Sequence, residues 1–160
     1  MFLGIQQGKI KFYTEQPLDE KFYNLDEVIE TQDEYVLDGE EYVLKDEAWE
    51  AKKQQAEKER IAMLSLTRGD VFRGLLMAKQ VTRAQIRAMI ENNETLTIFQ
   101  REMALIDFDE ALNFYRGNSL IDTLGATLGI SSEQLDRFFE TNDYTVLLPE
   151  EETETFDLEG

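Results

Sequence analysis

Carboxylates are the most numerous reactive side chains in this chain. Its 160 residues include 34 aspartates and glutamates, but no histidine and no cysteine. Imidazole and thiolate supply many of the bases, nucleophiles and metal ligands of enzymes, so only carboxylate, lysine or tyrosine chemistry remains. The nine glycines are scattered and form no GxxxxGK or GxGxxG phosphate loop. We therefore expect a protein that is not an enzyme and needs no cofactor.

One carboxylate group has a spacing that could suit a metal ion. Asp107, Asp109 and Glu110 fall within one turn of a predicted helix, and Asp107 would share a face with Glu110 or Ala111. Oxygen ligands of this kind bind hard cations such as Mg²⁺ and Ca²⁺. Without histidine or cysteine, a carboxylate site of this kind is the one plausible catalytic centre of the chain. The alternative, which we favour, is a solvated helix face.

A second carboxylate group surrounds the stretch "DEYVLDGEEYVLKDE", residues 33–47, which repeats Tyr-Val-Leu on either side of Asp-Gly. The repeat predicts a β-hairpin. A two-residue turn at Asp38 and Gly39 would set Val36 against Glu41. We prefer a four-residue loop from Asp38 to Glu41, because it pairs apolar side chains with one another: Leu37 with Tyr42, Val36 with Val43 and Tyr35 with Leu44.

The formal net charge is −18, and most of the excess lies at the two ends, residues 1–50 and 144–160. A field of this sign repels nucleic acid and attracts basic protein surfaces. The candidate partner-binding residues are therefore the acidic and aromatic side chains around the hairpin and the apolar pair in the acidic C-terminal run: Glu34, Tyr35, Asp38, Glu40, Glu41, Tyr42, Trp49, Phe156 and Leu158. The alternative interpretation is that this charge only confers solubility.

The elements that would position these residues predict an α+β protein. Residues 1–45 form a β-rich part with a small antiparallel sheet, in which "GKIKFYT" pairs with the hairpin. Residues 46–66 form a long connecting helix, and 67–143 a mainly α-helical domain. Residues 144–160 begin with a strand, Tyr144 to Leu148, which returns to the N-terminal sheet, and end in an acidic tail.

The helical domain contains two segments with helix-turn-helix spacing. In "SLIDTLGATLGISSEQLDRFF", residues 119–139, Gly125 allows a close approach of the two helices, Gly129 makes the turn, and Ser131 with Gln134 forms a capping box. Residues 71–90 align with this segment at an offset of 49 residues and form a second copy of the pattern. Thr82 aligns with Ser131, but Gln80 stands at the position of the turn glycine, Gly129. We expect that turn to differ.

The segment between the two copies, residues 96–117, predicts a long and largely buried helix that ends at Gly117. Direct DNA binding by the helix-turn-helix segments is disfavoured, because Glu133 and Asp136 would face phosphates. The first copy and its lead-in carry a local excess of arginine and lysine: Arg68, Arg73, Lys79, Arg83 and Arg87. The rest of the chain would oppose DNA binding, so we interpret both hairpins as packing elements.

A resemblance rests on "FYRGNSLIDTLGATLGISSEQLDRFF", residues 114–139, with "LTRGDVF", residues 66–72. These segments resemble a group of small proteins encoded by bacteriophages and prophages beside their tail genes. The opening "GKIKFY" and the hairpin "YVLDGEEYVL" are similar to the starts of phage tail-fibre assembly proteins. The resemblance implies a tail-region accessory protein, a chaperone or adaptor, that binds a tail or fibre protein in an infected or lysogenic host or on the virion.

Two hypotheses follow for the function. In the first, the chain is such an accessory protein and binds its partner through the N-terminal sheet and an exposed apolar patch near Tyr35, Tyr42 and Trp49. In the second, it is an acidic DNA mimic that occupies a basic nucleic-acid site on a host defence nuclease, as anti-CRISPR proteins do. No apolar run approaches the roughly 18 to 20 residues of a membrane span, so we expect a cytoplasmic protein with no membrane partner.

Overall fold

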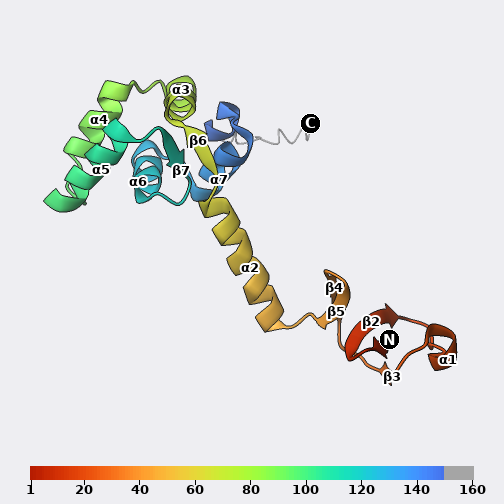
Figure 1. Ribbon diagram of the computed structural model, residues 1–160. Helices are drawn as coiled ribbons and strands as arrows, with labels where there is room; N and C mark the ends of the chain where they lie inside the picture. Colours follow the sequence, from red (N-terminus) through yellow and green to blue (C-terminus); the bar gives the residue numbers. More distant parts are fainter. Residues whose placement is uncertain (150–160) are drawn as a thin grey trace, which may run out of the picture. The chain divides into compact units, whose positions relative to one another are not determined.

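The computed structural model describes residues 1–149, and the chain divides into two compact units at Glu57 and Lys58. The first unit contains a small antiparallel sheet and a hairpin, and the second is mainly helical (Figure 1). This arrangement confirms the predicted α+β class. Phe156 and Leu158 lie outside the described residues.

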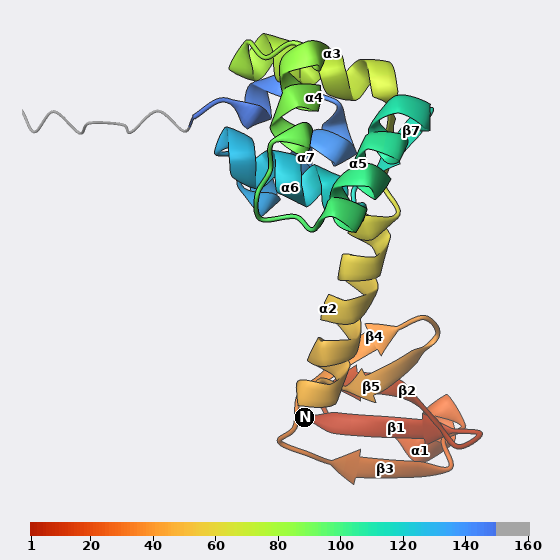
Figure 2. The ribbon, with the colours of Figure 1, turned by 90° about the vertical axis from the view of Figure 1, so that its left-hand side faces the viewer.

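The sheet of the first unit has three strands in the order β2-β1-β3 (Figure 2). The central strand is β1 (Phe2–Gln6), between β2 (Lys9–Thr14) and β3 (Glu27–Glu30). Between β2 and β3 lies the short helix α1 (Glu20–Tyr23), capped by Asp19. The predicted ladder between "GKIKFYT" and the hairpin is wrong, because β2 pairs with β1, which immediately precedes it through a tight turn.

The predicted hairpin register is confirmed. β4 (Tyr35–Asp38) and β5 (Glu41–Leu44) pair Leu37 with Tyr42, Val36 with Val43 and Tyr35 with Leu44. Because Asp38 also pairs with Glu41, the connecting turn consists of Gly39 and Glu40 and is two residues shorter than expected. Alignment of apolar side chains thus decides the register, and the ladder extends one pair further toward the turn.

The first unit has a very small core. Within residues 1–57, all of which are described, Leu3 is the one apolar side chain that is fully buried. Aromatic contacts make up the remainder: the Tyr13 ring on β2 lies 5.6 Å from that of Tyr35 and 5.9 Å from that of Tyr42. The hairpin is therefore held on the sheet mainly by half-buried rings.

The predicted helix over residues 46–66 is shorter in the structure. α2 (Glu47–Ala62) has no buried residue, and every residue from Glu50 to Arg60 is exposed. Residues Ser65–Thr67 instead form a strand, β6, which pairs antiparallel with β7 (Asn113–Tyr115). This pairing places Leu66 opposite the buried Phe114.

Both predicted helical hairpins are present in the second unit. The first is formed by α3 (Arg68–Lys79) and α4 (Arg83–Glu91), and the second by α6 (Ser119–Leu128) and α7 (Ser132–Thr141). Both expected capping boxes form, at Thr82 with Gln85 and at Ser131 with Gln134. Each box satisfies two backbone donors that the start of a helix would leave without a partner.

The two turns are alike, contrary to expectation. Gln80 adopts φ 55° and ψ 32°, and Gly129 adopts φ 67° and ψ 33°. In each hairpin this left-handed residue donates its backbone N–H to the last turn of the preceding helix. A non-glycine residue thus accepts the strained conformation in the first copy.

The segment between the copies differs from the prediction of one long, largely buried helix ending at Gly117. α5 (Ile98–Glu110) ends seven residues earlier, and β7 follows it. Only Phe108 of α5 is fully buried. The strand forms because pairing with β6 buries Phe114, a long-range gain that local helical periodicity does not reveal.

The strand expected from Tyr144 to Leu148 is also wrong. Residues Tyr144–Leu147 form a 3₁₀ helix, η1, capped by Asp143 and packed against α3 and α7. Leu147 is completely buried, and Gln134 donates from Nε2 to the Leu148 carbonyl at 2.9 Å. The apolar residues here complete the helical core instead of returning to the N-terminal sheet.

The core of the second unit is built from both hairpins, α5, the two strands and η1. Its fully buried apolar residues are Val71, Leu75, Ile86, Ile90, Phe108, Phe114, Leu120, Ile121, Leu124, Ile130, Leu135, Phe138, Phe139 and Leu147. Gly125 makes the close approach that was predicted, since a Cβ there would lie 2.6 Å from Leu135 Cδ1. Within residues 1–149, no helix combines the length and apolar character needed to cross a membrane.

The contact at Gly125 predicts the effect of a larger side chain. Gly125→Val should lower the free energy of unfolding by about 2 kcal/mol, because α6 and α7 would have to separate. Gly69→Ala is the matched control, since its Cβ would meet only Thr67 Oγ1, at 3.8 Å. Urea denaturation of both variants measures the difference, and equal stability of the two would contradict the close packing described.

Candidate functional site

The acidic residues predicted to bind a partner mostly have lysine partners within their own unit. Glu34 pairs with Lys45 at 2.9 Å, Asp38 with Lys53 at 3.0 Å and Glu41 with Lys9 at 3.7 Å. Glu40 lies exposed in the turn, where its carbonyl oxygen accepts from Lys11 Nζ at 2.9 Å. The hairpin therefore presents much less negative charge than its sequence suggests.

The predicted aromatic residues are half-buried rather than presented on a patch. Tyr35 and Tyr42 pack on the Tyr13 ring, whose hydroxyl donates to the Asp33 carbonyl at 3.0 Å. The third aromatic residue, Trp49 on α2, has Lys53 Nζ 5.4 Å from its ring centroid. These three residues hold the hairpin and the start of α2 in place, and the exposed apolar side chain of β4 is Leu37.

Two of the three carboxylates considered as metal ligands, Asp107 and Asp109, have other partners. Asp109 forms ion pairs with Arg87 and with Arg83, the latter at 3.6 Å, and Asp107 accepts from Asn118 Nδ2 at 3.2 Å. In residues 1–149, no three acidic or histidine side chains are grouped so that they could hold a metal ion. The interpretation of this cluster as a metal site has no support in the geometry.

The four arginines of the first helical hairpin are likewise engaged internally. Arg68 donates to the Asp109 carbonyl at 2.6 Å, Arg73 pairs with Asp70 at 2.9 Å, and Arg87 pairs with Glu91 at 3.0 Å as well as with Asp109. The guanidinium of Arg83 also lies over the rings of Phe72 and Phe108. This surface is therefore not a free basic patch.

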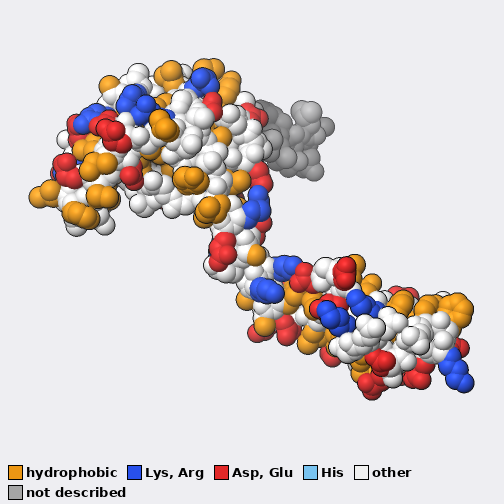
Figure 3. Space-filling model, in the orientation of Figure 1, with side chains coloured by type: hydrophobic (Ala, Val, Ile, Leu, Met, Phe, Trp, Pro, Cys, Tyr) orange, Lys and Arg blue, Asp and Glu red, His pale blue; other side chains and the backbone are white. Residues whose placement is uncertain are grey.

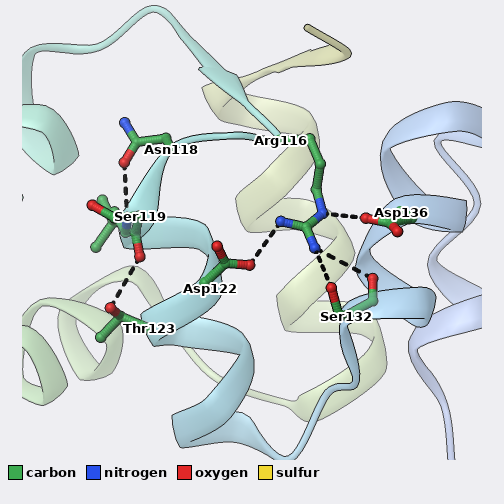
Figure 4. Close-up of polar contacts among 8 residues, drawn as sticks. Arg116, Asn118, Ser119, Asp122, Thr123, Ser132 and Asp136 are labelled. Atoms are coloured by element: carbon green, nitrogen blue, oxygen red, sulfur yellow. Dashed lines mark hydrogen bonds and ion pairs between the residues drawn. The ribbon is translucent and has the colours of Figure 1, made fainter. Parts of the chain in front are cut away.

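Arg116 is a buried charge that the sequence did not single out. Its side chain donates to Asp136 at 2.6 Å, to Asp122 at 2.7 Å and to Ser132 Oγ at 2.7 Å (Figure 4). Its backbone N–H donates to the Leu64 carbonyl at 2.8 Å. The residue thus joins α6 and α7 to the segment after α2, and its carboxylate partners leave no free guanidinium face for a ligand.

The clearest unpartnered surface is an apolar stripe on α5, made of Ile98, Phe99, Met103 and Ile106. Their exposed fractions are 78%, 74%, 46% and 53%, although three of them recur at the i, i+4, i+7 spacing of a packed helix face. Figure 3 shows hydrophobic side chains gathered over the end of the helical unit where α4 and α5 lie. Scattered exposed apolar residues are ordinary, but a contiguous stripe marks an interaction surface.

The stripe borders a hollow between α5 and α6. Phe99 and Met103 form part of its wall, and Leu120 and Thr123 of α6 line the opposite side of this cavity of about 200 Å³. The apolar periodicity of α5 predicts a buried helix, but the structure leaves this face exposed. Only the burial of Phe108 on the other side of the helix shows which face is turned outward.

A comparison of the chain with protein-family models, with curated proteins and with solved structures finds no match. The shape and chemistry of the chain's own surface are therefore the basis for a proposed function. The α5 stripe is apolar, exposed and next to a hollow, which is the form of a protein-binding surface.

Replacement of Arg116 should destabilise the helical unit. Arg116→Lys loses the planar fork that reaches Asp122, Asp136 and Ser132 together, so the free energy of unfolding should fall by about 2 kcal/mol. Arg73→Lys, at an exposed pair with Asp70, is the control and should change it by less than about 0.5 kcal/mol. If urea denaturation gave the same loss of unfolding free energy for both variants, the buried hydrogen bonds of Arg116 would contribute no more to stability than an exposed ion pair.

The ion pair between Asp38 and Lys53 should change the pKa of Asp38 measured by titration. The hydrogen bond and charge of Lys53 lower the pKa of Asp38 below its ordinary value. The contact therefore stabilises the fold above the unfolded-state pKa and is lost as pH falls through the folded pKa. In ¹³C NMR titrations, Lys53→Gln should raise the pKa of Asp38, whereas Lys45→Gln should leave it unchanged; an unaltered value in Lys53→Gln would refute the pairing.

Proposed function

We propose that this chain is a non-enzymatic protein that acts by binding another protein, as an assembly chaperone or adaptor. The observation that carries the proposal is the exposed α5 stripe beside a hollow on an otherwise well-packed helical unit. Burial of the exposed parts of these four side chains against a partner would favour a complex, with an upper limit of about 1.5 to 3 kcal/mol for each side chain before the cost of association.

The proposed partner is a phage tail or fibre protein, met in the cytoplasm of an infected or lysogenic host or on the virion. This part of the proposal rests on the resemblance of residues 114–139 and of the N-terminal hairpin to proteins encoded beside phage tail genes. The geometry adds the surface through which such a protein could be bound. We therefore propose the α5 stripe of the helical unit as the binding surface, in place of the N-terminal sheet and hairpin of the first hypothesis.

The DNA-mimic alternative receives less support from the same side chains. A mimic must present unpaired carboxylates to a basic site, but Glu34, Asp38 and Glu41 are each paired with a lysine. The exposed acidic surface that remains would confer solubility and would influence association rates.

The test is capture of partners by the full-length chain from an infected or lysogenic host, at low and at high salt. We expect a tail or fibre protein to be captured at both salt concentrations, because apolar burial is little affected by screening. The double variant Phe99→Ser/Met103→Ser should lose it. Leu76→Ser/Met77→Ser, which changes two exposed apolar residues of α3, is the matched control and should retain it.

Two outcomes would contradict the proposal. Equal capture by the stripe variant and the control would show that α5 is not the binding surface. Capture of a host nuclease that disappears at high salt and does not depend on the stripe would instead favour the DNA mimic.

A further inference from the structure

Beside the α5 stripe lies a groove formed by two neighbouring hollows that meet at Thr123 of α6. One, of about 200 Å³, is lined by the first half of α5 and the start of α6. The other, of about 820 Å³, lies between the α4–α5 connection and α6. Together they are large enough to accept several side chains of a partner.

The apolar lining of the groove comes from three helices and the connection between two of them. The larger of these residues are Met89, Leu96, Phe99, Met103 and Leu120, and Ala104 and Ala126 complete the lining. Phe99 and Met103 belong also to the exposed stripe, so the groove and the stripe are one continuous surface. Methionine side chains adapt to differently shaped apolar partners, which suits a groove that receives a helix.

The charged residues that line the groove are all acidic. They are Glu94, Asp107 and Asp122, and neither hollow is lined by lysine or arginine. Arg101, near the start of α5, donates instead to the carbonyls of Glu91 and Leu96, so its charge is directed into the α4–α5 connection.

Arg116 does not neutralise this acidity. It pairs with Asp122, but it also pairs with Asp136, so two carboxylates share one guanidinium and a negative charge remains. The side chain of Asp122 is 59% exposed, and this residue lines the larger hollow. A ligand in the groove would therefore meet apolar side chains and negative charge together.

We infer that the groove binds an amphipathic helix with a basic polar face, contributed by the partner protein. This inference rests on the proposed function and names the chemistry of its partner. Apolar residues at i, i+3, i+4 and i+7 of such a helix would meet Phe99 and Met103, and its lysines or arginines would meet the acidic rim.

Charge complementarity selects this occupant over two others. The C-terminal residues 150–160 of this chain carry acidic residues and no basic one, so they have the same sign as the rim. A second copy would place Glu94, Asp107 and Asp122 near an identical acidic surface. Only a partner with the opposite charge gains from both the apolar and the electrostatic parts of the groove.

The experiment measures binding of three synthetic peptides of about four helical turns to the full-length chain. The first has leucines at i, i+3, i+4 and i+7 and lysines on the other face. The second has the same composition in scrambled order, and the third replaces lysine by glutamate. Calorimetry gives each Kd, and methyl NMR of Met89 and Met103 reports contact with the groove.

We expect the basic amphipathic peptide to bind at least about tenfold more tightly than either other peptide. It should shift the methyl signals of Met89 and Met103. Phe99→Ser/Met103→Ser should weaken its binding about tenfold, and Leu76→Ser/Met77→Ser should leave it unchanged.

Three results would overturn the inference. If the scrambled peptide bound as tightly as the basic amphipathic peptide, binding would require only opposite net charge and no helical pattern. If the acidic peptide bound more tightly than the basic one, the partner helix would have an acidic face and not a basic one. Self-association of the wild-type chain that Phe99→Ser/Met103→Ser abolishes would make a second copy the occupant.

Failure of this inference is distinguishable from failure of the proposed function. If a captured phage protein requires the α5 stripe but the basic peptide does not bind, only the partner's chemistry is wrong. If capture does not require the stripe, the proposed binding surface itself is wrong, whatever the peptides do.

Discussion

The helical unit depends on the burial of one charged side chain, Arg116. Transfer of a guanidinium into a protein interior costs several kcal/mol, on the order of the stability of a small domain, unless hydrogen bonds and opposite charges replace its water. Asp122, Asp136 and Ser132 provide that replacement from α6 and α7. Through these hydrogen bonds and its backbone N–H to the Leu64 carbonyl, Arg116 links the second hairpin to the segment after α2.

The two helical hairpins reach similar structures by different local means. Gly129 makes one turn and Gln80 makes the other, and both occupy the left-handed region. The dipeptide Arg-Gly occurs before both hairpins but in different structures. Arg68 and Gly69 lie in the first turn of α3, whereas Arg116 and Gly117 precede α6, whose N-cap is Asn118. Similar spacing of the buried positions, such as Leu75 and Leu124, matters more than identical turn residues.

Charge has a different role in the N-terminal unit from the one its sequence suggested. The carboxylates around the hairpin are distributed so that lysines from β2, from the end of the hairpin and from α2 can reach them. Exposed pairs of this kind add little stability individually. Their effect is to reduce the local field of a unit whose apolar core is limited to Leu3 and a set of half-buried rings.

Features that depend on neighbouring residues could be predicted from the sequence: the α+β class, the hairpin register between Tyr35 and Leu44, both capping boxes and the close approach at Gly125. The sequence could not determine that Tyr144–Leu147 would complete the helical core, that β6 would pair with β7, or that Arg116 would be buried. It also misassigned the outward face of α5. These features depend on contacts between residues far apart in the chain, and helical periodicity shows that a face is apolar without showing whether another element covers it. The stripe from Ile98 to Ile106 remains exposed because long-range packing buries Phe108, on the opposite face of the same helix, in the core.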